Sequence, residues 1–527
     1  MTRISRRSVL AGGLAGTALL ATGARFVHAG QAAGERELRF EVKDDKGGPL
    51  PCRIHLTDPD GKPVRSPALP FWSDHFVCDG KASVRVPTGR YRYEIERGPE
   101  WRRVASTTDV KEGTDQPATV MVQVSRIANL QDRGWFAGDL HVHRPVEHVP
   151  LLMRAEDLHV APVITWWNRT NPWAGKAPPE PLLRRFDLNR FYHVMGGEDE
   201  RGGGALLLFN LDRPLEITQA DREYPTAAKF ARQARAKNPN VWLDAEKPFW
   251  WDVPLWAAGG LLDSVGIAHN HMWRTGALGN EAWGRPRDVD RYPDPQGNGL
   301  WTQDIYYHLL NCGLRLPPSA GSASGVLPNP VGYNRVYVHT GRDAELTYDA
   351  WWRGLKAGRC FVTNGPLLIC EVEGHDPGHV FRAEAGKALE LSVSVRITSS
   401  DPIRRVEIIK DGKVEGELRL EGNEAGERRG AGKVSFAGSG WFLVRAIADL
   451  PKTFRFASTG PFYVESEGRK SRISRASAQI FIDWTAERTE MLRRAIKSPD
   501  EQREVLAEHA AAERFWQDLA SRADAGT

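Results

Sequence analysis

Cysteine and long apolar runs are both scarce in this 527-residue sequence, and each scarcity excludes a class of protein. Five cysteines are too few for a cysteine-rich zinc array or for a small domain held by disulfides. No stretch approaches the run of about 20 apolar residues that a transmembrane helix needs, so we expect no membrane span in the mature protein. Walker-type, H-E-x-x-H and C-x-x-C patterns are also missing.

The sequence also lacks a large excess of charge of either sign. The formal net charge is +4, but residues 1–29 contain four arginines and no acidic residue. Beyond residue 29 the chain has 67 basic and 67 acidic residues. A balanced chain gives no electrostatic reason to expect nucleic acid or an anionic membrane as a partner.

The first 29 residues have the features of an export signal. Ser5–Leu10 contains the arginine pair Arg6-Arg7, a mild apolar run follows at Ala11–Ala21, and Val27–Ala29 supplies small residues for cleavage. An ordinary N-terminal anchor is the alternative interpretation. We predict a twin-arginine signal peptide over 1–29 and a periplasmic or extracellular protein. That route carries folded proteins, so a cofactor could be loaded before export.

Residues 30–130 and 376–466 have the period-two alternation of β-strands. Leu38–Val42 and Ala82–Val86 alternate in the first region, which resembles the carboxypeptidase-regulatory and transthyretin-like modules. Leu389–Val395 alternates in the second. We therefore predict two small β-sandwiches. Cys52 and Cys78 both fall in the first, either as a disulfide or as two thiols at apolar positions.

Residues 134–375 differ from the regions on either side. Short continuous apolar runs such as Ala161–Thr165 and Ala205–Phe209 are typical of strands buried on both faces, and helix-like stretches such as Ala227–Lys237 separate them. This alternation predicts a parallel α/β arrangement, with a barrel as one form. Thirteen of 18 tryptophans and nine of 15 histidines lie between residues 135 and 352. We therefore expect the functional site in this region. The tail at 467–527 predicts two helices. The overall fold class is therefore α/β plus β.

The strongest local pattern is Gly138–His143, which reads Gly-Asp-Leu-His-Val-His. On a strand, residues two apart point to the same side, so His141 and His143 would project two imidazoles together. Imidazoles suit zinc, manganese or iron, and a carboxylate such as Asp139 could orient one of them. The pattern predicts a divalent metal site, with structural histidines as the alternative.

That motif, at the start of an α/β domain, resembles the first motif of the polymerase and histidinol phosphatase (PHP) superfamily. The runs Leu310–Gly321, Gly332–Val338 and Phe361–Leu367 are similar to the CehA/McbA-type metallohydrolases within it. The resemblance covers residues 134–375. It implies a distorted β/α barrel of about seven strands, with metals at the carboxyl ends of the strands and hydrolysis of an ester, carbamate or phosphoester.

The resemblance extends to some of the implied ligands and not to others. His141 and His143 match the first motif, and Glu198 matches the glycine-x-glutamate strand end that usually supplies a bridging carboxylate. An expected Asp-His pair is replaced by Trp166–Asn168, and the late Gly-Ser-Asp motif reads Gly321–Ala323. These departures predict one or two ions in place of a trinuclear centre.

Other residues could complete the site. His269 and His271 form a second H-x-H pattern after an apolar strand. We favour His271 as the metal ligand because it lies further along the chain, nearer the mouth where barrel strands end. Glu246 is a further metal candidate, although Lys247 could simply pair with it. Glu198, His159 and Asp199 are the candidates for proton transfer or catalysis. Candidate substrate-binding residues are the tryptophans and one arginine: Trp166, Trp167, Trp250, Trp251 and Arg335.

Two functions follow from these observations. The first is an exported metal-dependent hydrolase that uses a metal-activated water on a small-molecule or polymer substrate. The alternative is a non-catalytic exported protein that binds a polymer or carbohydrate through a degenerate barrel, where the tryptophans recognise the ligand. The missing ligands favour the alternative, and the remaining histidines and acids favour the hydrolase. The sequence carries no signal for an oligomeric state.

Overall fold

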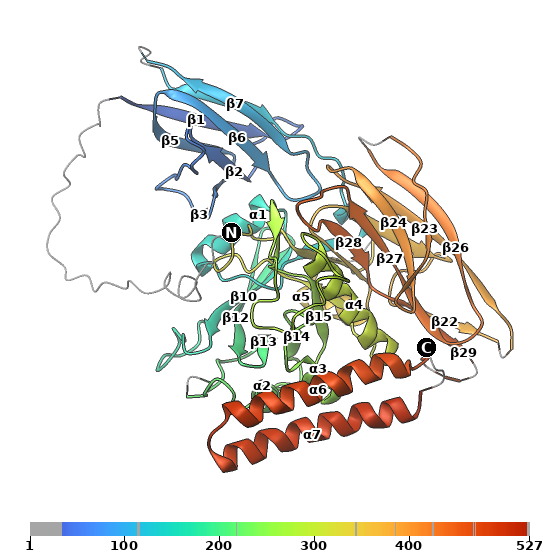
Figure 1. The fold of residues 1–527 in the computed structure, drawn as a ribbon. Coiled ribbons are helices and arrows are strands. Elements are labelled where there is room, and N and C mark those ends of the chain that lie inside the picture. Colours follow the sequence, from blue (N-terminus) through green and yellow to red (C-terminus); the bar gives the residue numbers. More distant parts are fainter. Residues whose placement is uncertain are drawn as a thin grey trace.

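The structure is a computed structural model that describes residues 34–523, apart from 113–115, 218, 343–344, 385, 424–425, 467 and 470. The expected signal peptide at 1–29 lies outside the described residues. The described chain combines several β-sheets with α-helices, which confirms the α/β plus β class. The N-terminal strands, the central α/β region and the C-terminal strands follow one another along the chain (Figure 1).

Two sheets make up the N-terminal region, in the orders β5-β1-β8 and β3-β4-β2-β6-β7. Strand β5 alternates between exposed and buried residues along its whole length, because only one face of its sheet is covered. Side chains from both sheets share one core, which includes Phe40, Ile54 and Val84. The strands are β1 (Glu35–Lys43), β2 (Cys52–Thr57), β3 (Phe71–Trp72), β4 (His75–Cys78), β5 (Lys81–Pro87), β6 (Gly89–Glu96), β7 (Val104–Val110) and β8 (Ala118–Gln123).

Cys52 and Cys78 lie opposite each other on the antiparallel strands β2 and β4. Their sulfur atoms are 3.8 Å apart and both side chains are buried, so the pair is present as two thiols in this structure. Of the two alternatives left open by the sequence, the structure contains the apolar-site thiols.

The central region contributes one part of a long mixed sheet. Its strands follow in the order β18-β15-β14-β13-β12-β10-β9-β19-β20. Its pairs are parallel except where β13, β19 and β20 run antiparallel to their neighbours. The strands are β9 (Trp135–Gly138), β10 (Val160–Trp167), β11 (Leu183–Phe186), β12 (Arg190–Arg201), β13 (Gly204–Phe209), β14 (Trp242–Ala245), β15 (Ser264–Ala268), β16 (Met272–Trp273), β17 (Gly276–Ala277), β18 (Pro318–Ala320), β19 (Arg335–His339) and β20 (Cys360–Thr363).

The segment that follows β9 connects β10 to β18, the first strand of this order. The amide of Ile164 donates to the carbonyl of Val142, which ties the segment to β10. On its other side the amide of Leu140 donates to Ala320, and that of His143 donates to Ser324. Val142 therefore bridges in parallel to both Val163 and Ser324. Residues 140–143 are held between β10 and the continuation of β18.

Helices cover the central sheet, and most of their apolar side chains enter one core with the strands. Helix α4 has buried residues on nearly every side, as expected for a helix enclosed by other elements. The α-helices are α1 (Val149–Ala155), α2 (Ala227–Lys237), α3 (Val253–Ala258), α4 (Gly297–Asn311) and α5 (Tyr348–Lys356), and short 3-10 turns occupy Gln131–Arg133 and Val146–His148.

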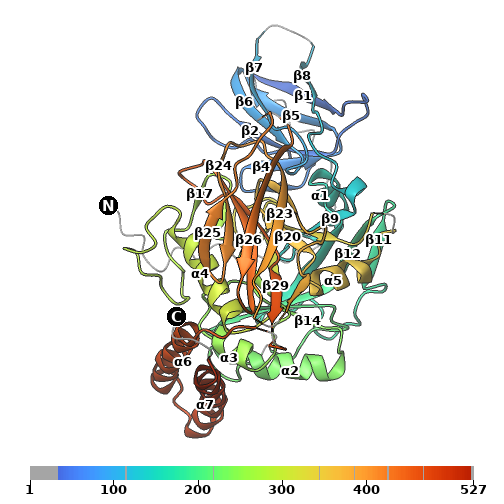
Figure 2. The ribbon, with the colours of Figure 1, turned by 90° about the vertical axis from the view of Figure 1, so that its right-hand side faces the viewer.

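The C-terminal strands continue the central sheet. Strand β20 pairs with β28, and the order then runs β28-β27-β24-β25, while β21, β23 and β26 form a separate sheet (Figure 2). Strand β21 pairs with β23 although it precedes residue 376. The strands are β21 (Leu367–Val372), β22 (Val380–Ala383), β23 (Leu389–Thr398), β24 (Ile403–Lys410), β25 (Lys413–Glu417), β26 (Arg428–Phe436), β27 (Gly440–Ala448), β28 (Phe456–Thr459) and β29 (Phe462–Ser466).

Two long helices end the chain and pack as a hairpin against the central region, drawn in red in Figure 1. They are α6 (Arg475–Ala495) and α7 (Pro499–Ser521), and the side chains of Ser474 and Ser498 cap their first turns. Arg488 on α6 is buried and pairs with Asp252 and Glu223 of the central region. The expected C-terminal helices are therefore present and fold back on the body.

Candidate metal site

The side chains selected from the sequence gather where several strands end. His141 and His143 follow β9, Glu198 lies near the end of β12, Glu246 follows β14, and His269 follows β15. These strands all run in the same direction, so their carboxyl ends meet at one edge. This common edge explains why residues more than a hundred positions apart become neighbours.

Three ligand atoms converge there. His141 Nε2 and His143 Nε2 are 3.0 Å apart, and Glu198 Oε2 lies 3.4 Å from the first and 3.0 Å from the second. An ion with tetrahedral bonds of about 2.0–2.1 Å holds its ligands about 3.3 Å apart. The three atoms are therefore spaced like one face of a tetrahedral site, and this group could hold a metal ion.

The charges of the group depend on one another. Although burial lowers the pKa of His141, Glu198 and Glu246 raise it to about 10. Burial lowers the pKa of His143 below its usual value. His141 and His143 together lower the pKa of Glu198 to about 2, against the effect of burial. The charged forms of His141 and Glu198 therefore stabilise each other.

Glu246 lies behind His141. Its Oε1 is 3.3 Å from His141 Nδ1, while its Oε2 accepts a hydrogen bond of 2.9 Å from Trp250 Nε1 and contacts Lys247 Nζ. A carboxylate on Nδ1 keeps that nitrogen protonated and leaves the lone pair of Nε2 for an ion. Glu246 therefore lies where it can support His141. It also forms the ion pair with Lys247 that was the alternative interpretation of this residue.

Asp139 holds the main chain around the site. Its carboxylate accepts hydrogen bonds from the amides of His141 and Ser322, both 3.0 Å long, and from the amide of Gly332 at 2.6 Å. The expectation that Asp139 orients an imidazole is therefore wrong, because its oxygens are used by backbone groups. It connects the His141 segment to the loop after β18.

His269 and His271 do not join the three-ligand group within the described residues. His269 Nε2 lies 2.8 Å from Thr302 Oγ1, and its Nδ1 accepts from the amide of His271 at 3.3 Å, so both ring nitrogens have partners. His271 Nδ1 is buried without a hydrogen-bond partner in the described chain. Both rings contact Phe249. Of the two, His271 is the one with a free nitrogen.

His159 and Asp199 lie away from the group. His159 directly precedes β10, whereas the ligands lie beside the middle and the end of that strand, because Val142 bridges Val163 and Glu198 pairs with Trp167. Its ring nitrogens contact the amide of Ala137 and the side chain of Gln131. Asp199 is buried and makes two hydrogen bonds to Arg201, at 2.5 and 2.7 Å. Neither residue is positioned to act on a substrate at the three ligands.

The four candidate tryptophans have different surroundings. The Trp167 ring lies 5.3 Å from that of His143 and is partly exposed, so it borders the site. Trp250 reaches the site only through Glu246. Trp166 is buried in the main core, and Trp251 donates to the carbonyl of Trp283. Of these four side chains, Trp167 is the one whose ring contacts a ligand of the three-atom group.

Arg335 is buried at the start of β19, beside a cavity between the N-terminal and C-terminal sheets. Its guanidinium donates to the carbonyls of Gly332 and Glu156, at 2.5 and 2.9 Å, and pairs with the Glu156 carboxylate. These partners belong to the protein itself, so Arg335 joins segments of the chain at a distance from the three ligands.

Glu200 is a site residue that the sequence reasoning passed over. It lies two positions after Glu198 on β12, so both side chains leave the same face of the strand. Asn168 fixes its main chain, because the Asn168 side chain accepts from the Glu200 amide at 2.7 Å and donates to its carbonyl at 2.8 Å. Burial and the charge of Glu198 raise the pKa of Glu200 to about 8. The sequence signal that points to Glu200 is the alternation of side chains along a strand, which repeats every two residues.

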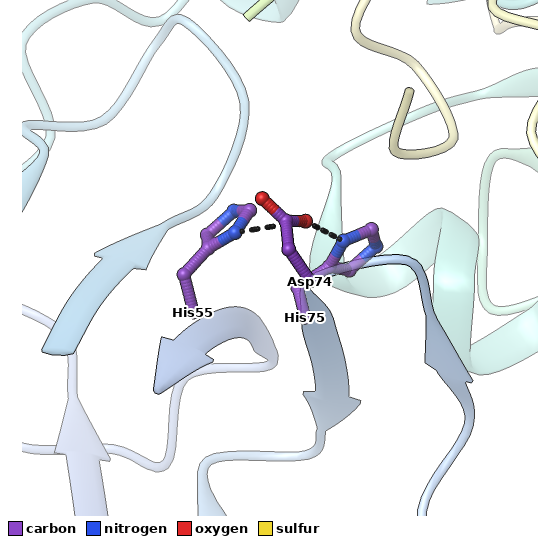
Figure 3. Close-up of side chains that lie close together, drawn as sticks. All are labelled: His55, Asp74 and His75. Carbon is purple, nitrogen blue, oxygen red and sulfur yellow. Dashed lines mark hydrogen bonds and ion pairs between the residues drawn. The ribbon is translucent and has the colours of Figure 1, made fainter. Parts of the chain in front are cut away.

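A second group that could hold a metal ion lies in the N-terminal sheets: His55, Asp74 and His75 (Figure 3). Asp74 Oδ1 is 3.2 Å from His55 Nδ1 and 3.0 Å from His75 Nδ1. However, His55 Nε2 accepts a hydrogen bond from Arg53 Nε at 3.1 Å, so the proton of a neutral His55 is on Nδ1. A metal at Nδ1 would move that proton to face Arg53. The donor set therefore fits a hydrogen-bonded triad better than a metal.

Asp244 lies beneath the site, and we expect it to make stability depend on pH. Its carboxyl contacts the hydroxyls of Ser264 and Ser319, and burial raises its pKa to about 7. As pH rises from about 4 to about 7 the unfolded chain loses this proton and the folded protein keeps it, so stability falls across that window by up to about 4 kcal/mol. Asp244→Asn cannot ionise and should lose less stability.

Thermal unfolding between pH 5 and pH 8 measures this difference. The melting temperature of Asp244→Asn relative to wild type should rise with pH, whereas the exposed control Asp60→Asn should keep a constant offset. A constant offset for Asp244→Asn as well would show that Asp244 is ionised throughout the range.

Comparisons with known proteins do not identify the chain. No family model and no curated protein matches it. Among solved structures, a streptococcal ancillary pilin is similar at a TM-score of 0.14 and 16% identity, over 21% of this chain and 37% of that one. The N-terminal domain of PorA is similar at a TM-score of 0.13 and 10% identity, over 19% of this chain and 98% of that one. Within the described residues no helix is long and apolar enough to cross a membrane.

Proposed function

We propose that the protein is an exported metal-dependent hydrolase related to the PHP superfamily, of the CehA/McbA type. The observation that carries the proposal is the set of three ligand atoms, His141 Nε2, His143 Nε2 and Glu198 Oε2, spaced 3.0–3.4 Å apart. Three protein ligands leave coordination positions for water and substrate, as in catalytic zinc sites. Zinc, manganese and iron all suit this donor set.

The surrounding strands support the same relationship. Strands β9, β10, β12, β13, β14, β15 and β18 follow one another in the sheet, and the 140–143 segment, which continues β9, is hydrogen-bonded both to β10 and to the last of them, β18. We infer a distorted seven-stranded barrel with its site at the carboxyl ends of the strands. The twin-arginine pattern at Arg6-Arg7 supports export to the periplasm or beyond.

Each residue then has a defined task. His141, His143 and Glu198 would hold the ion, and Glu246 would keep the His141 proton on Nδ1. A divalent ion in this position acts as a Lewis acid on a carbonyl or phosphoryl group and lowers the pKa of water toward about 7. Trp167 would form an aromatic wall beside the bond to be cleaved. An ester, carbamate or phosphoester is the expected substrate class.

Hydrolysis by metal-loaded protein tests the proposal. Protein purified without chelator is loaded separately with zinc, manganese and iron, and is then offered nitrophenyl esters, carbamates and phosphoesters. We expect turnover of at least one class, its loss on treatment with a chelator, and its return when the metal is restored. If the loaded protein binds its ion and hydrolyses none of the three classes, the non-catalytic binding protein becomes the better interpretation.

A further inference from the structure

We infer that Lys247 is a resident cation of this site, which takes the place of a second metal ion and limits the site to one divalent ion. The inference rests on the proposed metal site and adds its stoichiometry and the residue that determines it. Lys247 would be a positioning residue, since it acts through Glu246 on His141 and touches neither substrate nor ion.

The surroundings of Lys247 carry the first part of the argument. The residue is 2% exposed, so its ammonium has almost no access to water. Nζ contacts Glu246 Oε2 and lies 4.7 Å from the ring centre of Trp250. Among the described residues Glu246 is its only ion-pair partner. A buried ammonium is costly unless a fixed negative group balances it, and here that group is the carboxylate beside His141.

Glu246 divides its two oxygens between two cationic neighbours. Oε1 faces His141 Nδ1 at 3.3 Å, and Oε2 receives Lys247 together with Trp250 Nε1. Burial alone would raise the pKa of Glu246, but Lys247 and His141 hold it far below its usual range. Lys247 and Trp250 Nε1 already occupy Oε2, so a second ion could bind that oxygen only by displacing the ammonium.

The histidines at the end of the neighbouring strand resemble an incomplete ligand set. His269 and His271 follow β15, which pairs in parallel with β14, the strand directly before Glu246 and Lys247. Burial, together with the Lys247 charge, lowers the pKa of His269 to about 3 and that of His271 well below its usual value. His271 Nδ1 has no hydrogen-bond partner in the described chain, so one imidazole nitrogen remains available there. Without Lys247, Glu246 and His271 would offer an oxygen and a nitrogen to a cation.

The charges beside Lys247 also favour a single ion. Glu246 already pairs with the Lys247 ammonium, and Glu198 lies with the two histidine ligands. A second divalent ion would place further positive charge next to the ammonium in a buried site, where like charges repel strongly.

Metal stoichiometry in variants of Lys247 tests the inference. Each protein is stripped with a chelator, equilibrated with excess zinc and desalted, and its zinc is counted by mass spectrometry. We expect one equivalent in wild type and in the conservative variant Lys247→Arg, which keeps the positive charge. We expect two equivalents in Lys247→Met. The added ion should be lost again in Lys247→Met combined with His271→Ala.

Circular dichroism and thermal unfolding accompany each count, and Lys247→Gln replaces Lys247→Met if the methionine variant does not fold. One equivalent in the folded neutral variant, or two in wild type, would overturn the role of Lys247 while leaving the proposed function intact. No zinc in wild type and one equivalent in Lys247→Met would remove the proposed function but support the resident cation. No zinc in either protein would overturn both.

Discussion

Replacing His141 and His143 together by alanine should remove the divalent ion from the protein. The change deletes two of the three ligand atoms that lie within 3.4 Å of one another and leaves Glu198 alone. A single carboxylate cannot organise a site of this kind, so we expect less than about a tenth of an equivalent of metal after loading. Metal counted by mass spectrometry in chelator-free buffer measures the effect.

The matched control is the other group of two histidines and one carboxylate. His55→Ala with His75→Ala removes the same number of imidazoles from the N-terminal sheets. Because Arg53 fixes the His55 proton on Nδ1, this variant should keep the metal content of wild type. If the His55 and His75 variant loses the ion and the His141 and His143 variant retains it, the site has been assigned to the wrong group.

Gly197→Ala should cause a large loss of stability. A Cβ at residue 197 would lie 1.9 Å from Cε2 and Cζ2 of Trp166, whose ring is buried against β12. Trp166 belongs to the main core and has no room to withdraw. Overpacking usually costs about 1–3 kcal/mol, and we expect about 3 kcal/mol or more here because two ring atoms are met at once.

Urea unfolding measures that loss, and Gly438→Ala serves as its control because an added Cβ there meets nothing within 4 Å. The Gly197 variant should also bind less metal, since Glu198 is the next residue and would shift with the strand. A change of less than about 0.5 kcal/mol in Gly197→Ala, comparable to an ordinary surface substitution, would mean that Trp166 can rearrange at little cost.

The contrast between Glu200 and Asp199 indicates how far the sequence leads at this site. His141, His143 and Glu198 could be selected because each follows or ends an apolar run, and parallel strands deliver such residues to one edge. Asp199 is the candidate taken from the sequence, although strand alternation places Glu200, two positions from Glu198, on the ligand face. Asp199 points to the opposite face of the strand, where its carboxylate accepts hydrogen bonds from Arg201. The alternation of side chains along a strand, with its period of two residues, points to Glu200 as the neighbour of Glu198.

Other features depend on contacts between distant segments. The sequence identifies Glu246 as an acid at a strand end, but only its position behind His141 distinguishes a supporting carboxylate from a ligand. The same holds for Trp166 and Trp167, which are adjacent in sequence and face opposite sides of β10. Nothing in the sequence likewise indicates that β20 pairs with β28, since about a hundred residues separate them.

That pairing sets an order of events during synthesis. Strand β20 lies between β19 of the central region and β28, so the sheet that carries the metal ligands is complete only when residues 456–459 have been made. The growing chain must therefore hold its central strands without one neighbour until nearly nine-tenths of it has left the ribosome. The ligand-bearing sheet is therefore completed late in synthesis, after the strands that carry the ligands have been made. That order is compatible with the export route proposed above, which accepts proteins only after they have folded.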